Sequence, residues 1–132
     1  MKLAPCTTRV AHWHPRGPEM GYVTKGSMVA GFVFENNTAW EVEIGLDQAV
    51  TWPQGIVHYY KNIACEPFEF IASFPNPNPG TIPVTLNAAA LPKDFQRAYF
   101  GGITLSEVTE KAIGGFYDNK TCVQACLKSK GL

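Results

Sequence analysis

The sequence predicts an all-β barrel-like fold that is followed by short helices. Up to about Ile82, short runs rich in Val, Phe, Trp, Tyr and Ile are separated by turn residues, at the spacing of a β-sandwich or barrel. Beyond Pro92 the apolar residues recur with a helical period instead. A chain of 132 residues is expected to form one domain. We expect the barrel to cover about 1–90 and a helical extension about 91–132.

The β region divides into strands at its turns. Asn36-Asn37-Thr38 joins two strands in a hairpin, because asparagine tolerates a positive φ. A second turn falls at Pro53-Gln54-Gly55. The proline-rich segment 75–80 forms a stiff, extended connector, because proline cannot donate a ladder hydrogen bond. The strands between these breaks are expected at Met28–Phe34, Ala39–Ile44, Ile56–Ile63 and Pro67–Phe74.

Three short helices are expected after the connector. The first covers Pro92–Phe100. The second opens on the capping box Thr104-x-x-Glu107 and ends near Gly114. The third covers Thr121–Lys128. Helices in this position usually form a lid, a brace or an oligomer contact, so we expect a structural role for them.

Composition narrows the classes of partner. Eleven basic and eleven acidic side chains cancel to a net charge of zero without a basic cluster, so we expect no nucleic-acid partner. No apolar run approaches the roughly 20 residues of a membrane span, so no membrane partner is expected either. The first residues lack the apolar core of a signal peptide. The localisation therefore stays open.

The four cysteines allow one or two disulfides. Cys122 and Cys126 lie four residues apart in an expected helix, where the geometry suits a mutual bridge poorly. Cys6 and Cys65 lie in two expected strands. The sequence therefore favours a Cys6–Cys65 bridge, although the redox state of the cysteines stays open.

All three histidines of the chain belong to one pattern of metal ligands. His12 and His14 alternate along a strand and so point to the same face. Glu19 follows a Pro-Arg-Gly-Pro turn, and His58 comes just after the turn at Pro53–Gly55. A lone strand histidine is more often a core or surface group, but this joint pattern predicts a site with three nitrogens and one oxygen. Such a donor set suits Mn, Fe, Co, Ni, Cu or Zn.

Two motifs carry a resemblance to a known family. They are His12-x-His14-x4-Glu19-x6-Gly26 and Pro53-x-Gly55-x2-His58-x3-Asn62. Together they resemble the two signature motifs of the cupin superfamily. His14-Pro15-Arg16 and the run Trp52-Pro53-Gln54-Gly55-Ile56-Val57-His58 more narrowly resemble its germin-like and spherulin-like branch.

The resemblance implies a jelly-roll barrel with one divalent transition metal inside its mouth. Its ligands would be His12, His14, Glu19 and His58, with manganese the first choice and iron, zinc, nickel or copper as alternatives. The helices would brace a neighbouring subunit in a homodimer or larger homo-oligomer. Members of the branch are usually secreted, and Gly26 and Asn62 would hold turns.

Activities in the branch imply an oxidase or decarboxylase with Mn or Fe, acting on a small carboxylate or enol. The alternatives are a lyase, isomerase or cyclase that acts on a larger metabolite, and a non-enzymatic protein that binds or stores metal. Fold analogy does not choose between them.

The sequence also departs from the family pattern. Cys6 and Asp47 stand where the family has glycine, and Asp adopts a left-handed conformation at modest cost. Arg9 replaces the asparagine that germin oxalate oxidases carry three residues before the first histidine. Arg9 is thus a candidate contact for a substrate carboxylate, if it faces inward, with a solvated strand-edge cation as the commoner role. The usual strands before the first motif are missing, so either the sequence is partial or another subunit completes the barrel. We favour a second subunit that covers the open sheet edge.

Strand aromatics surround the expected ligands. They are numerous enough to line an apolar pocket at the metal, although plain core packing is their commoner role. Alternation places Tyr59 on the face opposite His58, and it places Glu41 and Glu43 on a solvated face. The aromatic residues concerned are Trp13, Phe32, Phe34, Trp40, Trp52, Tyr59 and Tyr60.

Overall fold

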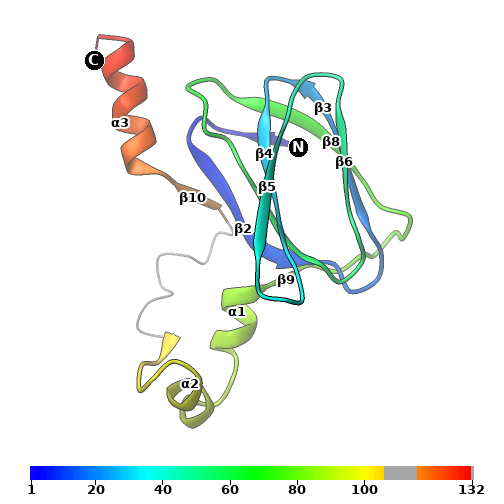
Figure 1. Cartoon of the computed structure of the whole chain (residues 1–132), viewed down its shortest axis with the longest axis vertical. Coiled ribbons are helices and arrows are strands. Elements are labelled where there is room, and N and C mark those ends of the chain that lie inside the picture. The colour runs from blue at the N-terminus through cyan, green and yellow to red at the C-terminus, as the bar shows by residue number, and fades with distance from the viewer. Residues whose placement is uncertain (106–115, 132) are drawn as a thin grey trace.

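Two antiparallel sheets face each other in the computed structural model, which describes residues 1–105 and 116–131 (Figure 1). One sheet has the strand order β1-β8-β3-β6. The other has the order β10-β2-β7-β4-β5, with β9 also paired to β2. The strands are β1 (Lys2–Leu3), β2 (Thr7–Trp13), β3 (Glu19–Lys25), β4 (Met28–Val33), β5 (Ala39–Ile44), β6 (Ala49–Trp52), β7 (Val57–Lys61), β8 (Phe68–Ser73), β9 (Ile82–Pro83) and β10 (Phe116–Asp118).

The hairpin predicted around Asn37 is confirmed. β4 and β5 pair from Met28↔Ile44 to Val33↔Ala39, and Asn37 has a φ of 62°. Cys6 and Asp47 have φ values of 60° and 62°. Both therefore adopt the left-handed conformation that glycine would favour at these positions.

The hydrophobic core fills the space between the two sheets. Alternating residues of β3 and β8 point inward, as period-two patterning requires. Three buried aromatic side chains from β6, β7 and β4 meet there and pack beside the histidines described below. The buried core residues are Leu3, Val23, Met28, Ala30, Phe32, Val50, Trp52, Tyr60, Phe68 and Phe70.

The chain itself covers the outer side of β2. β10 pairs with β2 through Phe116↔Arg9, and β9 pairs with it through His12↔Pro83. Neither short strand was expected from the sequence, because two or three residues are too few to show an alternating pattern. The side of β2 that faces away from β7 therefore has strand partners from the same chain.

In the part of the chain that the structure describes, three helices lie outside the sheets: α1 (Val84–Ala89), α2 (Lys93–Tyr99) and α3 (Lys120–Ser129). The expected helices at 92–100 and 121–128 are confirmed by α2 and α3. Helix α1 lies in the segment that we expected to belong to the barrel. The helix expected from the capping box falls mostly on 106–115, outside the described residues. None of the described helices is long and apolar enough to cross a membrane.

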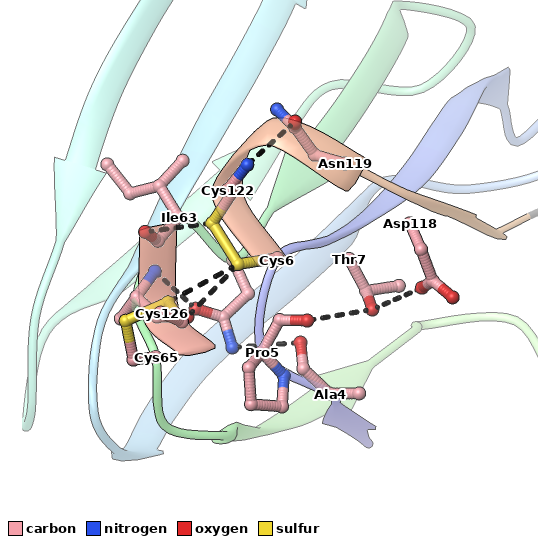
Figure 2. Close-up of a disulfide and its surroundings, with 12 residues drawn as sticks. Ala4, Pro5, Cys6, Thr7, Ile63, Cys65, Asp118, Asn119, Cys122 and Cys126 are labelled. Atoms are coloured by element: carbon pink, nitrogen blue, oxygen red, sulfur yellow. Dashed lines mark hydrogen bonds between the residues drawn. A yellow bond between two sulfur atoms is a disulfide. The ribbon is translucent and has the colours of Figure 1, made fainter. Parts of the chain in front are cut away.

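The expected Cys6–Cys65 bridge is wrong. Cys6 is bonded to Cys122 and Cys65 to Cys126, with Cα–Cα distances of 5.5 and 5.3 Å (Figure 2). The loops around Cys6 and Cys65 lie side by side, and the Cys6 amide donates a hydrogen bond to the Ala64 carbonyl. Cys122 and Cys126 lie one turn apart on α3 and face this pair, so each bonds to the barrel rather than to the other.

Candidate metal centre

Four buried residues converge between the two sheets. His12 lies near the end of β2, His14 lies just beyond it, Glu19 begins β3 and His58 lies in β7. Their side chains are at most 5% exposed. Each offers one potential ligand atom, and these atoms lie within 4.8 Å of one another. These four residues are called the His/Glu cluster below, and they could hold one divalent metal ion.

An irregularity in β2 sets which side chains face this cluster. His12 pairs with His58 and Arg9 pairs with Tyr60, and the register shifts between the two pairs. Directly paired residues of an antiparallel ladder share a face, and His58 and Tyr60 are two residues apart. Arg9 and His12 therefore lie on the same inner face although they are three positions apart in the sequence. Strict alternation without the shift would have turned Arg9 outward.

Backbone carbonyls fix the orientation of all three imidazoles. Nδ1 of His12 lies 2.7 Å from the Val10 carbonyl oxygen, and Nδ1 of His58 lies 3.0 Å from that of Ile56. Nδ1 of His14 is hydrogen-bonded to the Gly80 carbonyl. A carbonyl only accepts, so Nδ1 carries the hydrogen in each ring. Nε2 is then left with a lone pair toward the cluster, as in histidine–metal sites.

The lone pairs of the cluster require a cation. Oε2 of Glu19 lies 2.9 Å from Nε2 of His14 and 3.2 Å from Nε2 of His58. With neutral imidazoles, acceptors face acceptors, which is unfavourable unless a proton or metal ion lies between them. Neighbouring ligands of a six-coordinate ion with bonds of roughly 2.1 Å are about 3.0 Å apart. The residues present therefore fit a divalent metal.

The pKa values of the cluster favour the metal-binding protonation states. Burial lowers the pKa of His12 from 6.5 to about 4 and outweighs the opposing effect of the hydrogen bond with the Val10 carbonyl. Burial alone would raise the pKa of Glu19, but hydrogen bonds and charge from His58 and His14 outweigh it and lower that pKa. At neutral pH His12 is neutral and Glu19 is ionised, as metal coordination requires.

Acid is expected to destabilise the metal-free protein. Since the pKa of His12 is about 4 when folded and 6.5 when unfolded, the unfolded chain binds the proton first as the pH falls. The contribution of His12 to the free energy of unfolding is complete above pH 6.5 and lost by about pH 4, with a maximum of roughly 3 kcal/mol. Urea unfolding of chelator-treated protein at a series of pH values measures this free energy. His12→Gln should show a shallower dependence over this pH range, and equal slopes would contradict the assignment.

Aromatic rings enclose the His/Glu cluster. The ring centroid of Phe74 lies 4.8 Å from that of His14. The ring centroid of Trp52 lies 5.1 Å from that of His58, and the ring centroid of Tyr60 lies 6.1 Å from that of His12. Two other members of the expected aromatic set, Trp40 and Phe34, are 54% and 43% exposed. Tyr59 instead donates to the Glu41 carboxylate on the outer face, as alternation predicts.

The connector at 75–80 has a role that the sequence analysis missed. The Gly80 carbonyl orients His14, and Arg16 donates to the Asn78 carbonyl and side-chain oxygen at 2.6 Å each. Gly80 has a φ of 71°, and a Cβ there would lie 2.8 Å from the Arg16 side chain. Glycine is therefore required where the connector contacts the first motif.

Asn62 holds a turn, as the resemblance implied. Its side-chain amide donates to the carbonyls of Leu3, Ala4 and Glu66, and its oxygen accepts from the Ala64 amide. It is 2% exposed, so these bonds satisfy a buried amide. Asn62 therefore ties the N-terminal strand to the loop that follows β7.

The two sheets and the buried His/Glu cluster together define the class: a small jelly-roll protein with one interior site suited to a divalent metal. Comparison with known proteins gives the family. The Cupin family model matches residues 1–101. The chain therefore belongs to the cupin family, as its motifs predicted.

Curated relatives include spherulins and germin-like proteins. Spherulin-1A and spherulin-1B of Physarum polycephalum are 30% and 36% identical to the chain, over 98% of it and 53% of each relative. A germin-like protein of Arabidopsis thaliana, subfamily 2 member 2, is 36% identical over 69% of the chain and 43% of its own length. The chain thus spans about half the length of the Physarum relatives.

Solved structures support the same fold. Oxalate decarboxylase of Bacillus subtilis, a protein with Mn(II) centres, superposes with a TM-score of 0.79 at 23% identity. The match covers 90% of this chain and 32% of the decarboxylase. An oxalate oxidase superposes with a TM-score of 0.75 at 23% identity, over 86% of this chain and 61% of its own. At this identity the likeness shows the cupin fold.

Proposed function

We propose that the His/Glu cluster binds one divalent transition metal and that the chain is a metal-dependent oxidase or decarboxylase of a small carboxylate or enol. The proposal depends on one observation: backbone carbonyls fix the three imidazoles so that their Nε2 lone pairs face the Glu19 carboxylate. A cation is needed between these acceptors. Manganese is the first choice because a structural neighbour has Mn(II) centres. Iron, zinc, nickel and copper fit the same donor set.

A bound Mn or Fe ion would supply Lewis acidity and redox chemistry to a substrate oxygen. The protein side chains would hold the site in place and keep it partly dry. The carbonyls of Val10, Ile56 and Gly80 orient the imidazoles, and the aromatic rings described above exclude water. Four protein ligands leave two positions of a six-coordinate ion for substrate.

Arg9 is our candidate for the substrate carboxylate contact. Its register partner Tyr60 places it on the inner face, and its guanidinium lies 5.2 Å from the Phe116 ring centroid. Its charge also acts on the buried Tyr60 and His12. A guanidinium can bind a carboxylate through two parallel hydrogen bonds, so Arg9 could orient a small acid at the cluster.

Arg9→Gln is expected to lower kcat/KM for a carboxylate substrate at least about tenfold, because charged hydrogen bonds are lost. The metal content should stay at the wild-type value, since Arg9 is not in the His/Glu cluster. Arg97→Gln in exposed α2 is the matched control and should leave both quantities unchanged. Unchanged kinetics for Arg9→Gln would remove Arg9 from the substrate site.

The function is tested by stripping the protein with chelator and restoring it with Mn, Fe or Zn in turn. Oxygen consumption and carbon dioxide release are measured with oxalate and with enols. Turnover that disappears on chelation and returns with one redox metal would support the proposal. Zinc-dependent turnover of a larger metabolite would favour the lyase or isomerase alternative, and bound metal without turnover would favour storage.

We also propose a homo-oligomer. Helices α1 and α2 extend away from the sheets (Figure 1), and apolar side chains along this segment are exposed: Leu91 by 42%, Phe95 by 62%, Tyr99 by 80% and Ile103 by 56%. Several large apolar side chains exposed along one segment mark a candidate interaction surface. A second copy of the chain is the partner that the resemblance to germin-like proteins favours.

Phe95→Glu is expected to weaken self-association about tenfold or more, since it buries a charge in an apolar contact. Light scattering after size-exclusion chromatography measures the molar mass. Glu43→Ala on the outer face of β5 is the control and should keep the wild-type mass. A wild-type protein that is monomeric at high concentration would refute the oligomer.

A further inference from the structure

One buried polar atom remains without a hydrogen-bond partner among the described side chains: Nε1 of Trp52. The Trp52 side chain is fully buried. An indole N–H only donates, so it needs an acceptor. Buried polar groups are nearly always satisfied, and an exception in a native structure calls for an explanation such as a bound ligand.

Trp52 lies beside the His/Glu cluster. It ends β6, and its Cα pairs with that of Glu19 on β3. Directly paired residues share a face, so the indole and the Glu19 carboxylate both face the interior. The Trp52 ring stacks on His58, with centroids 5.1 Å apart and an interplanar angle of 23°. The orphaned donor therefore belongs to a ring that stacks on His58 and to a residue that is the register partner of Glu19.

The orientation of the indole directs its N–H away from the packed core. Cζ3 of Trp52 would lie 3.2 Å from a Cβ at Gly21, a position that Phe70 and Met28 also approach. In an indole, Nε1 lies on the edge opposite Cζ3. The hydrocarbon edge thus packs against the apolar interior, and the polar edge faces the other way.

Within residues 1–105 and 116–131 this N–H has no acceptor. The Glu19 oxygen nearest the imidazoles is already shared by His14 and His58. A phenylalanine would stack on His58 without leaving a buried donor bare. A tryptophan is therefore suited to this position if the acceptor arrives with a ligand.

We propose that Trp52 Nε1–H donates a hydrogen bond to an oxygen of a small carboxylate bound at the metal-loaded His/Glu cluster. This inference rests on the proposed function and extends it, because it adds a residue that selects oxyanions. Trp52 and Arg9 would then contact the carboxylate from different strands, β6 and β2. Neutral ligands that lack an acceptor oxygen would leave the N–H unsatisfied and bind more weakly.

The first test observes the N–H directly in the wild-type protein. The full chain is loaded with diamagnetic Zn(II), its three tryptophan side chains are labelled with ¹⁵N, and oxalate or acetate is titrated. The Trp52 indole proton is expected to move downfield at saturation. The resonances of Trp13 and Trp40 should stay in place. Binding of the carboxylate with an unmoved Trp52 resonance would overturn this inference and leave the proposed function standing.

The second test compares Trp52→Phe with Trp40→Phe by calorimetry of oxalate binding to the Zn(II)-loaded proteins. Trp52→Phe should weaken oxalate binding about ten- to hundredfold, with the zinc content unchanged. Trp40→Phe should match the wild type, since Trp40 is exposed on β5. Equal affinities would overturn the inference. Failure of the wild type to bind zinc, or to bind oxalate when loaded, would overturn the proposed function together with it.

Discussion

Replacing His58 with alanine is expected to remove most of the bound metal and to lower the melting temperature by roughly 10 °C. His58 is 1% exposed, and its Nε2 is one of the three imidazole donors. Loss of one ligand weakens metal binding, and the folded state then loses the stabilisation that a bound ion gives it by mass action. The deleted ring also leaves a cavity against Trp52.

Elemental analysis and thermal unfolding by circular dichroism measure both effects. Glu41→Ala is the matched control, because this carboxylate lies on the outer face and pairs with Lys61 at 2.8 Å. Such a surface pair contributes at most about 1 kcal/mol. The control should keep the wild-type metal content. Equal metal content in both variants would refute the assignment of the cluster.

Removing one disulfide, as Cys6→Ser with Cys122→Ser, is expected to lower the free energy of unfolding by about 4 kcal/mol. Helix α3 has no buried residue within the chain, so packing contributes little to its attachment. The described bonds that attach it to the barrel include the two disulfides, a hydrogen bond from the Asn119 amide to the Cys6 carbonyl and an exposed Lys130–Glu66 pair. The covalent bridges therefore dominate (Figure 2).

The second bridge supplies a control for the first. Cys65→Ser with Cys126→Ser opens a loop of 61 residues. When the Cys65–Cys126 bridge is kept, the shortest covalent path from Cys6 to Cys122 runs along the chain to Cys65 and crosses that bridge to Cys126. The loop closed by Cys6–Cys122 is therefore also about 60 residues long. The two double variants should thus be destabilised to a similar extent. Non-reducing peptide mapping identifies the pairing, and a Cys6–Cys65 peptide would contradict the structure.

Local pattern was enough to predict much of the fold and the candidate site. The β4–β5 hairpin follows from two asparagines between alternating runs, and α2 and α3 follow from their helical period. The convergence of His12, His14, Glu19 and His58 was predictable because it depends on alternation and on two short turns. The hairpin and the helices are decided by residues close together in the sequence, whereas His58 lies 39 residues after Glu19 and was linked to the cluster through its own motif.

The features that the sequence did not reveal depend on distant contacts. The inward position of Arg9 follows from a register shift against β7, which leaves no mark in the residues of β2. The disulfides depend on where α3 docks, more than 110 residues after Cys6. Spacing alone therefore led to the wrong pair. The Gly80 carbonyl that orients His14 likewise comes from a segment that looks like a plain connector.

The most direct test is a crystal structure of protein purified without added metal, with anomalous diffraction recorded at the absorption edges of Mn, Fe, Ni, Cu and Zn. We predict a single anomalous peak in each chain, roughly 2.0–2.2 Å from Nε2 of His12, His14 and His58 and from a carboxylate oxygen of Glu19. A metal-loaded crystal in which the peak lies elsewhere, or in which these four side chains point apart, would contradict the proposed metal centre.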